Sequence, residues 1–91
     1  DAEHINAIGA QLADLSARTQ DLRGIFDVDA KAERLRTVNA SLEDPAVWND
    51  PKKAQELGRE QKSLSAVVDA LSRLARELAD NTELFEMSRA E

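Results

Sequence analysis

This 91-residue sequence contains no cysteine and no tyrosine, and aromatic residues make up only 3% of it. Without cysteine, the chain can form neither disulfides nor thiolate metal sites. No apolar run approaches the roughly 18 residues that a membrane span needs. The first residues also lack the basic start and apolar middle of a secretory signal. We therefore expect a cytoplasmic protein that does not contact a membrane.

Charged residues make up 33% of the chain and apolar residues 42%, most of the latter alanine and leucine. This composition favours helices packed side by side over a β-sheet, and the length suffices for a single domain, residues 1–91. The net charge is −6, and the acidic excess lies mostly in residues 1–50. Because an acidic domain repels phosphate at long range, strong binding to free nucleic acid is not expected.

A first helix is predicted over residues 3–23. It carries a stripe of apolar residues along one face. One polar residue, Thr19, belongs to this stripe, and the methyl group of its side chain can still pack. The members recur at alternating steps of three and four: Ile5, Ile8, Leu12, Leu15, Thr19, Leu22 and Phe26. This spacing places them on the one helix face that packs against a neighbouring helix. Gly24 then predicts a left-handed cap or a bend.

A second helix is predicted to end at Glu43. Its apolar residues also recur at steps of three and four: Val28, Ala32, Leu35, Val38 and Leu42. Asp27 and Asp29 can each cap it by accepting from its free amides. Two Asp-Pro pairs follow, in which Asp can cap and Pro can occupy the first helical position. They predict a short helical turn over Pro45–Asn49 and a long helix that begins at Pro51.

The third helix has the longest stripe: Ala54, Leu57, Gln61, Leu64, Val68, Leu71, Ala75 and Leu78. Val67 and Leu74 widen it enough to face two neighbours. Gly58 costs about 1 kcal/mol relative to Ala, which the close approach of another backbone would explain. Residues 80–83 have the form of a capping box and predict a fourth helix, cut short at Glu91. We therefore expect an all-α fold, an antiparallel three-helix bundle with the start of a fourth helix.

No residue is predicted to be catalytic or to bind a metal or cofactor. His4, the only histidine, lies on an end expected to fray, so we interpret it as an exposed residue. The carboxylates alternate with basic residues as on a solvated helix face, for example Glu33 with Arg36. Trp48 has an indole that can stack on a nucleic-acid base. Its neighbours favour another interpretation, a plug that packs into the end of the bundle.

The densest group of basic residues lies at the start of the third helix: Lys52, Lys53, Arg59 and Lys62. Lys52, Arg59 and Lys62 lie near one face of this helix. These residues can serve solubility, which we favour, or they can contact RNA phosphate or an acidic protein surface. The partner-binding residues are unknown from the sequence.

Several short segments carry a resemblance to a known family. They are Leu22-Arg23-Gly24, Asp29-Ala30-Lys31, Glu33-Arg34-Leu35, Val38-Asn39-Ala40, Leu42-Glu43, Pro45, Val47-Trp48-Asn49, Pro51, Ala54-Gln55, Leu57-Gly58, Leu64 and Val67-Val68-Asp69. Over about residues 12–87, the chain resembles the N-terminal helical domain of the bacterial peptide chain release factor 2 family. The Val-Trp-Asn turn with its two prolines is more characteristic of this family than of its sister, release factor 1.

The resemblance implies a longer class I release factor that directs translation termination at UGA and UAA. In that family, a Ser-Pro-Phe tripeptide reads the codon and a Gly-Gly-Gln loop triggers peptidyl-tRNA hydrolysis. Neither motif occurs here, so no such residue is carried over and the chain is not expected to be an enzyme. The resemblance instead implies an accessory docking role. The implied partners are the GTPase-associated region of the large ribosomal subunit, near the stalk base, and the class II release factor.

Two other functions stay open. The heptad pattern also suits a stand-alone, coiled-coil-like structural protein that oligomerises, whereas the release-factor resemblance predicts a monomer. The remaining alternative is a helical RNA-binding arm that uses the basic residues of the third helix. The net charge disfavours it.

Overall fold

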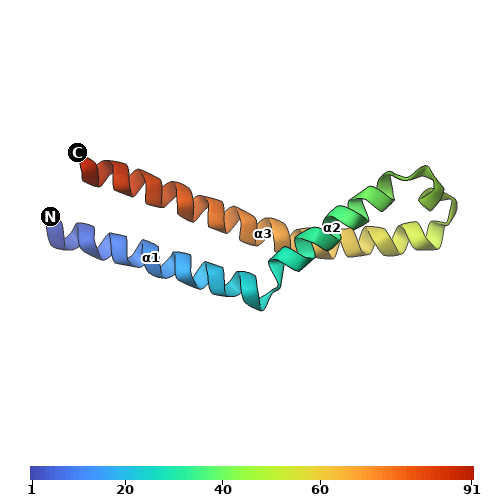
Figure 1. Cartoon of the computed structure of the whole chain (residues 1–91), viewed down its shortest axis with the longest axis horizontal. Helices are drawn as coiled ribbons and strands as arrows, with labels where there is room; N and C mark the ends of the chain where they lie inside the picture. Colours follow the sequence, from blue (N-terminus) through green and yellow to red (C-terminus); the bar gives the residue numbers. More distant parts are fainter. The chain divides into compact units, whose positions relative to one another are not determined.

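All of residues 1–91 are described by the computed structural model, and every regular element in it is helical. Three α-helices, α1 (Ala2–Ile25), α2 (Val28–Glu43) and α3 (Pro51–Ala90), are accompanied by a 3₁₀ helix, η1 (Pro45–Asn49) (Figure 1). The all-α prediction is thus confirmed. None of these helices combines the length and the hydrophobicity that a membrane span requires.

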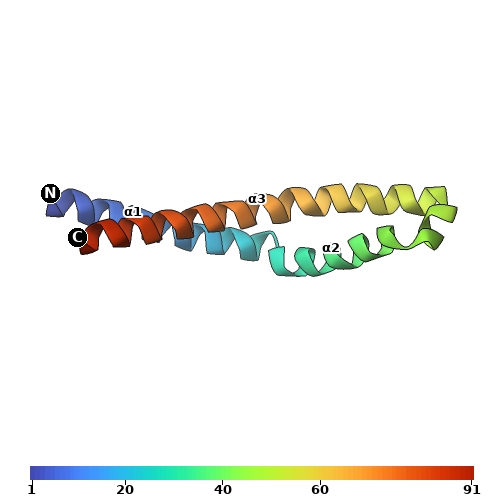
Figure 2. The same cartoon turned by 90° about the horizontal axis from the view of Figure 1, so that it is seen from above.

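The chain divides into two compact units. Unit 1 consists of residues 1–25 and 71–91, in which α1 and the C-terminal part of α3 run side by side in opposite directions (Figures 1 and 2). Unit 2 consists of residues 26–70, in which α2 and the N-terminal part of α3 form an antiparallel pair joined through η1. That residues 1–91 form a single domain stays a prediction.

The three-helix bundle is not confirmed, because each unit pairs two helical segments. The lengths explain this pairing, since α3 has 40 residues while α1 has 24 and α2 has 16. The apolar stripe of α3 is therefore long enough to serve α1 and α2 in turn. Its width led us to expect two neighbours at once, whereas it has one helical partner within each unit.

The predicted fourth helix is wrong. α3 continues without a break from Pro51 to Ala90, so residues 80–83 lie inside it. A capping-box sequence starts a helix only where the preceding residues leave helical geometry, and no proline or glycine after Gly58 interrupts α3. Of the apolar residues that follow, Phe85 continues the stripe of α3 in unit 1 and lies against Gly9, whereas Leu84 and Met87 are exposed.

The turn after α1 also differs from the prediction. Gly24 is an ordinary helical residue, and α1 continues to Ile25. The left-handed residue is Asp27, with φ 54° and ψ 48°. Its backbone carbonyl accepts from the Lys31 N–H at 3.0 Å, but its side chain makes no capping hydrogen bond. Because aspartate tolerates this conformation better than most residues with a side chain, Asp27 sets the start of α2 through its backbone.

Both Asp-Pro pairs act as predicted. The Oδ1 atom of Asp44 accepts from the Ala46 N–H at 3.0 Å, and that of Asp50 accepts from the Lys53 N–H at 3.3 Å. Each carboxylate thus satisfies an amide that the new helix leaves free. The predicted start of α3 at Pro51 and the short turn before it are confirmed.

The buried residues are few and come mainly from the predicted stripes. In unit 1 they are Thr19, Leu71 and Leu78, and in unit 2 they are Val28, Val38, Ala54 and Leu57. Val38 is 0% exposed and Val28 is 1% exposed. The Thr19 hydroxyl donates to the Leu15 carbonyl at 2.8 Å, so this polar group is satisfied while its methyl packs.

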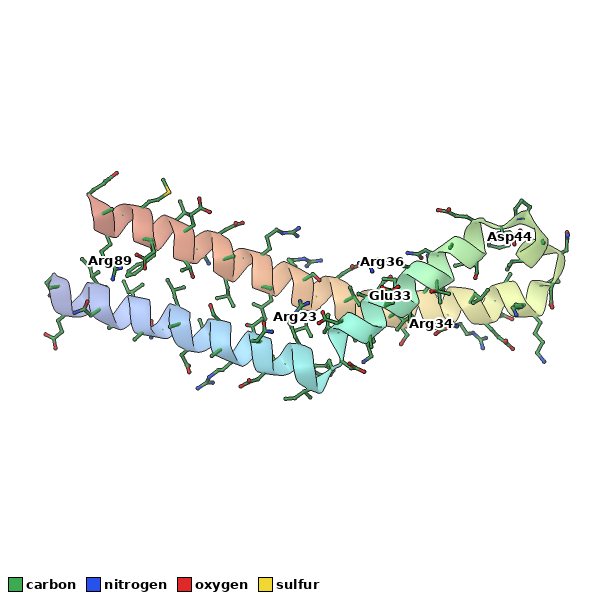
Figure 3. The ribbon with its side chains drawn as sticks, in the orientation of Figure 1. Arg23, Glu33, Arg34, Arg36, Asp44 and Arg89 are labelled. Carbon is green, nitrogen blue, oxygen red and sulfur yellow. The ribbon has the colours of Figure 1, made fainter.

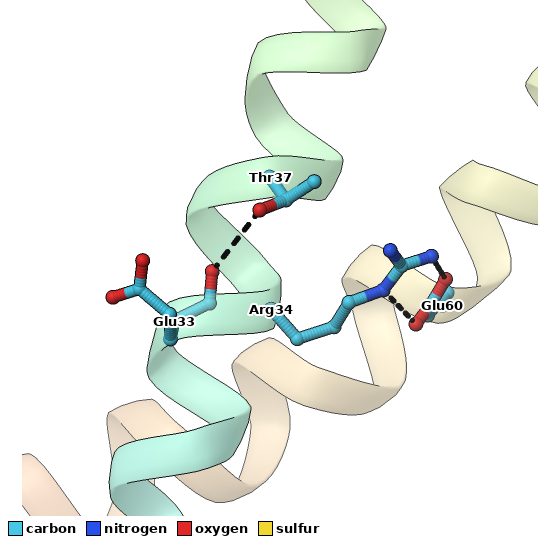
Figure 4. A network of polar contacts seen from close by, with 4 residues as sticks. All are labelled: Glu33, Arg34, Thr37 and Glu60. Atoms are coloured by element: carbon cyan, nitrogen blue, oxygen red, sulfur yellow. Dashed lines mark hydrogen bonds and ion pairs between the residues drawn. The ribbon is translucent and has the colours of Figure 1, made fainter.

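A bidentate ion pair links the two helices of unit 2 (Figure 4). Arg34 donates from Nε to Oε2 of Glu60 at 2.7 Å and from Nη2 to Oε1 at 2.8 Å. Nearby in sequence, the Gln61 amide donates to Oδ1 of Asn39 at 2.6 Å. The hydrogen bonds from Arg34, helped by its charge, lower the pKa of the Glu60 carboxyl and raise that of the guanidinium. The pair is bidentate and charge-assisted, which is the stronger form of side-chain hydrogen bond.

The glycines provide a matched test of packing. A Cβ atom built on Gly9 would lie 3.2 Å from two ring atoms of Phe85, whereas one on Gly58 would meet nothing within 4 Å. The backbone contact that we expected at Gly58 is therefore absent. We predict that Gly58→Ala raises the free energy of unfolding by about 0.5–1 kcal/mol through helix propensity.

Gly9→Ala should gain less or lose stability, because the Phe85 ring must move. Urea unfolding followed by circular dichroism measures both changes. An equal gain for the two variants would contradict the contact between Gly9 and Phe85.

The lowered pKa of Glu60 predicts a pH-dependent contribution to stability. The ionised form is favoured in the folded state, so the contribution is present above the pKa of the unfolded chain. It is lost as the pH falls below that value and through the lower pKa of the folded state. The melting temperature of Glu60→Gln should thus lie below that of the parent chain at neutral pH, and this difference should shrink at acid pH.

The control for this prediction is Glu86→Gln. Glu86 accepts from Arg89 three residues along the same exposed helix face, an arrangement that contributes little to stability. A pH-independent difference for Glu60→Gln, as large at pH 3 as at pH 7, would contradict the prediction.

Candidate functional site

The only histidine lies where the sequence placed it, at the exposed start of α1. The His4 backbone N–H donates to Oδ1 of Asp1 at 2.7 Å. An open hollow of about 320 Å³ is lined by Asp1, Glu3, His4 and Ala7, all of them exposed. No group of three or more histidine or carboxylate side chains in the structure is arranged to hold a metal ion. That the chain has no metal and no catalytic residue stays a prediction.

Two further hollows lie between the helices of unit 1. One of about 180 Å³ has no ionisable side chain and is lined by Ser16, Thr19, Gln20, Ala75, Leu78 and Ala79. The other, of about 190 Å³, has only one and is lined by Ile5, Ile8, Phe85, Ser88 and Arg89. In Figure 3, Arg89 lies on α3 near its C-terminal end, and its guanidinium is 5.7 Å from the centre of the Phe85 ring. Neither hollow holds the pair of groups that general acid–base catalysis requires.

Trp48 does not plug the end of a bundle, so the prediction of core packing is wrong. Its side chain is 60% exposed. The indole Nε1–H donates to the backbone carbonyl of Leu42, in the last turn of α2, at 2.8 Å. A C-terminal carbonyl that the helix leaves without a partner is thus satisfied by the indole. The hydrogen bond holds the ring along the end of α2 while much of its surface faces solvent.

The residues around Trp48, which we call the η1 tip (residues 43–53), combine this aromatic ring with opposite charges. Glu43, Asp44 and Asp50 precede and follow η1, which has no charged residue of its own. Figure 3 shows Asp44 beside η1, where the turn after α2 begins. The two lysines of the η1 tip follow in the first turn of α3, and all of these charged residues are exposed. An exposed ring that carboxylates flank in the sequence is a surface that suits a cationic side chain.

The four basic residues at the start of α3, Lys52, Lys53, Arg59 and Lys62, are all exposed, and none of their side chains has an ion-pair partner. By helical spacing, Lys52, Arg59 and Lys62 lie near one face of α3, away from the buried Ala54 and Leu57. Lys53 lies off that face. The structure thus leaves these basic residues in solvent, where they are compatible both with solubility and with a contact to a partner.

Sequence reasoning found the local ion pair between Glu33 and Arg36 and missed the one between helices. Arg36 donates to Glu33 at 2.6 Å, as the spacing predicted. The bridge between Arg34 and Glu60 joins residues that are 26 positions apart. No periodicity signals such a pair, because it depends on the register of α2 against α3.

Comparison with known proteins identifies the family. The model of the PCRF domain matches residues 31–91. The peptide chain release factor 2 of Variovorax paradoxus (strain S110) is 76% identical over 89 residues, which cover 98% of this chain and 24% of that protein. The factors of Acidovorax sp. (strain JS42) and Bordetella avium (strain 197N) are 70% and 58% identical over 91 residues, which cover 100% of this chain and 25% of each.

The chain thus spans about a quarter of the length of the curated relatives that it matches. The match to the family model includes most of α2, η1 and α3, the elements that build unit 2 and contribute to unit 1. The chain therefore belongs to the PCRF-domain family, to which its resemblance to the release factors had pointed.

Proposed function

We propose that the chain is an accessory docking domain of a peptide chain release factor and acts in translation termination. The observation that carries this proposal is the identity of 76% with a relative named peptide chain release factor 2, over 98% of the chain. Similarity of this extent over almost every residue favours a shared role for this part of the protein. In this proposal, residues 1–91 form one domain of a longer polypeptide, in the cytoplasm, that acts at UGA and UAA codons.

The proposed domain is not catalytic. These residues contain neither the Gly-Gly-Gln nor the Ser-Pro-Phe sequence that the family uses for hydrolysis and codon reading. Both hollows of unit 1 lack a pair of acid–base groups. The proposed role is therefore mechanical, in that a helical surface positions the factor on its partners.

The proposed partners are the GTPase-associated region of the large ribosomal subunit and the class II release factor. The surface chemistry supports a docking role at such a place. Net charge of −6 suits contact with basic ribosomal proteins, and the exposed basic residues of α3 can still meet RNA locally. The domain is not expected to bind free nucleic acid strongly.

One observation favours a second candidate, a structural module that associates with copies of itself. Leu84 and Met87, on the part of α3 in unit 1, are 62% and 59% exposed. Exposed apolar residues of this kind on a helix pair with a heptad pattern can form a seam with another chain.

The docking proposal predicts that the isolated chain binds ribosomes and releases no peptide. The 91-residue chain should sediment with large ribosomal subunits, and hydrolysis of peptidyl-tRNA on ribosomes halted at UGA should stay at background. Val38→Asp places a charge at a position that is 0% exposed and should abolish binding by unfolding the chain. Asp69→Asn, on the exposed surface, is the matched control. Peptide release above background would refute the non-catalytic assignment.

The oligomeric state separates the two candidates. Analytical ultracentrifugation of the chain should show a monomer across the micromolar range if it is a docking domain. A stable dimer or larger oligomer that is lost in Leu84→Glu/Met87→Glu would favour the structural module instead.

A further inference from the structure

Trp48 is the only tryptophan of the chain, and it is both exposed and held in place. The hydrogen bond of 2.8 Å from its Nε1–H to the Leu42 carbonyl fixes one edge of the indole. An aromatic side chain that is already ordered loses little conformational entropy when a partner covers it. Tryptophan is also enriched among the residues that dominate binding energy. A large apolar ring in this state is suited to recognition.

The charges beside the ring indicate the chemistry of a partner. Asp44 and Asp50 bound η1, and each uses Oδ1 to cap a backbone N–H. A carboxylate has two oxygens and about four acceptor positions, so each retains capacity for another donor. Glu43 adds a third exposed carboxylate. A guanidinium or ammonium group that lies on the indole face can therefore meet a carboxylate at the same time.

We propose that the η1 tip is a docking surface for a basic protein segment that places an arginine or lysine side chain over Trp48, between the carboxylates of Asp44 and Asp50. This inference rests on the proposed function, and the partner is accordingly a basic protein of the large ribosomal subunit.

RNA fits this surface less well than a basic protein does. A base stacked on Trp48 would bring its phosphates close to Glu43, Asp44 and Asp50, which repel them. Lys52 and Lys53 would offset part of this repulsion. The three carboxylates outnumber the two lysines in residues 43–53, so charge complementarity favours a cationic protein surface.

A basic protein partner and an RNA partner predict opposite effects on binding when the carboxylates of the η1 tip are neutralised. Asp44→Asn/Asp50→Asn removes both charges but keeps side-chain oxygens that can cap η1 and α3. This variant should bind large ribosomal subunits several-fold more weakly, whereas RNA would bind it more tightly. Lys52→Gln/Lys53→Gln should bind at least as well as the parent chain. Asp69→Asn, which removes one exposed negative charge elsewhere in unit 2, is the control for the loss of a carboxylate away from the η1 tip and should change nothing.

Replacing the ring tests its own contribution. Trp48→Ala should weaken binding to large subunits about tenfold, and Trp48→Phe should retain part of the affinity. Circular dichroism checks that both variants keep the helicity of the parent. A photo-crosslinking residue, p-benzoylphenylalanine at position 48, should join the chain to a ribosomal protein.

The possible failures are distinguishable. If Trp48→Ala binds as the parent chain does, this inference is overturned while the docking function stands. Crosslinks to ribosomal RNA alone, or weaker binding of the Lys52→Gln/Lys53→Gln variant, would also overturn it in favour of an RNA contact. If the parent chain does not bind large subunits, the docking function fails, and the inference fails with it.

Discussion

The structure depends on one long stripe along α3, which is apolar except at Gln61. This helix is the partner of α1 in unit 1 and of α2 in unit 2, so neither shorter helix has a core without it. Few side chains are fully buried, and the two largest of them, Val28 and Val38, both lie on α2. A kink in α3 would therefore remove the packing surface of two other helices. The prolines of the chain fit this constraint, since Pro45 belongs to η1 and Pro51 stands at the first position of α3.

Features set by local sequence could be predicted, and those set by helix pairing could not. The Asp-Pro caps and the ends of α2 and η1 follow from hydrogen bonds within a few residues, and they were right. The predicted fourth helix was wrong because a capping-box sequence at residues 80–83 does not by itself show whether the preceding helix has ended, and α3 continues through it. Gly58 was assigned a neighbour that it lacks, while Gly9, which touches Phe85, was overlooked. The two glycine errors concern which helices pack against each other and in what register.

The candidate site shows the same division. Segments that include the Val-Trp-Asn turn were sufficient to indicate the family, which the match over residues 31–91 bears out. The sequence also singled out Trp48, but its orientation depends on one hydrogen bond to the end of α2. A bulky aromatic residue next to apolar neighbours is usually buried. Here this bond holds the indole along the end of α2 with much of its surface in solvent, and the residue expected to pack into the core is instead an exposed apolar group of the η1 tip.

The position of Trp48 also determines what the intrinsic fluorescence of the chain can report. With one tryptophan and no tyrosine, nearly all near-ultraviolet absorbance and intrinsic fluorescence of the chain comes from this single indole. Because the ring is already surrounded largely by water, its emission should be red-shifted in the native chain and should change little when the helices separate. Fluorescence would thus be a poor monitor of unfolding and a selective monitor of occupancy, since only a molecule that excludes water from the indole would shift the signal to the blue.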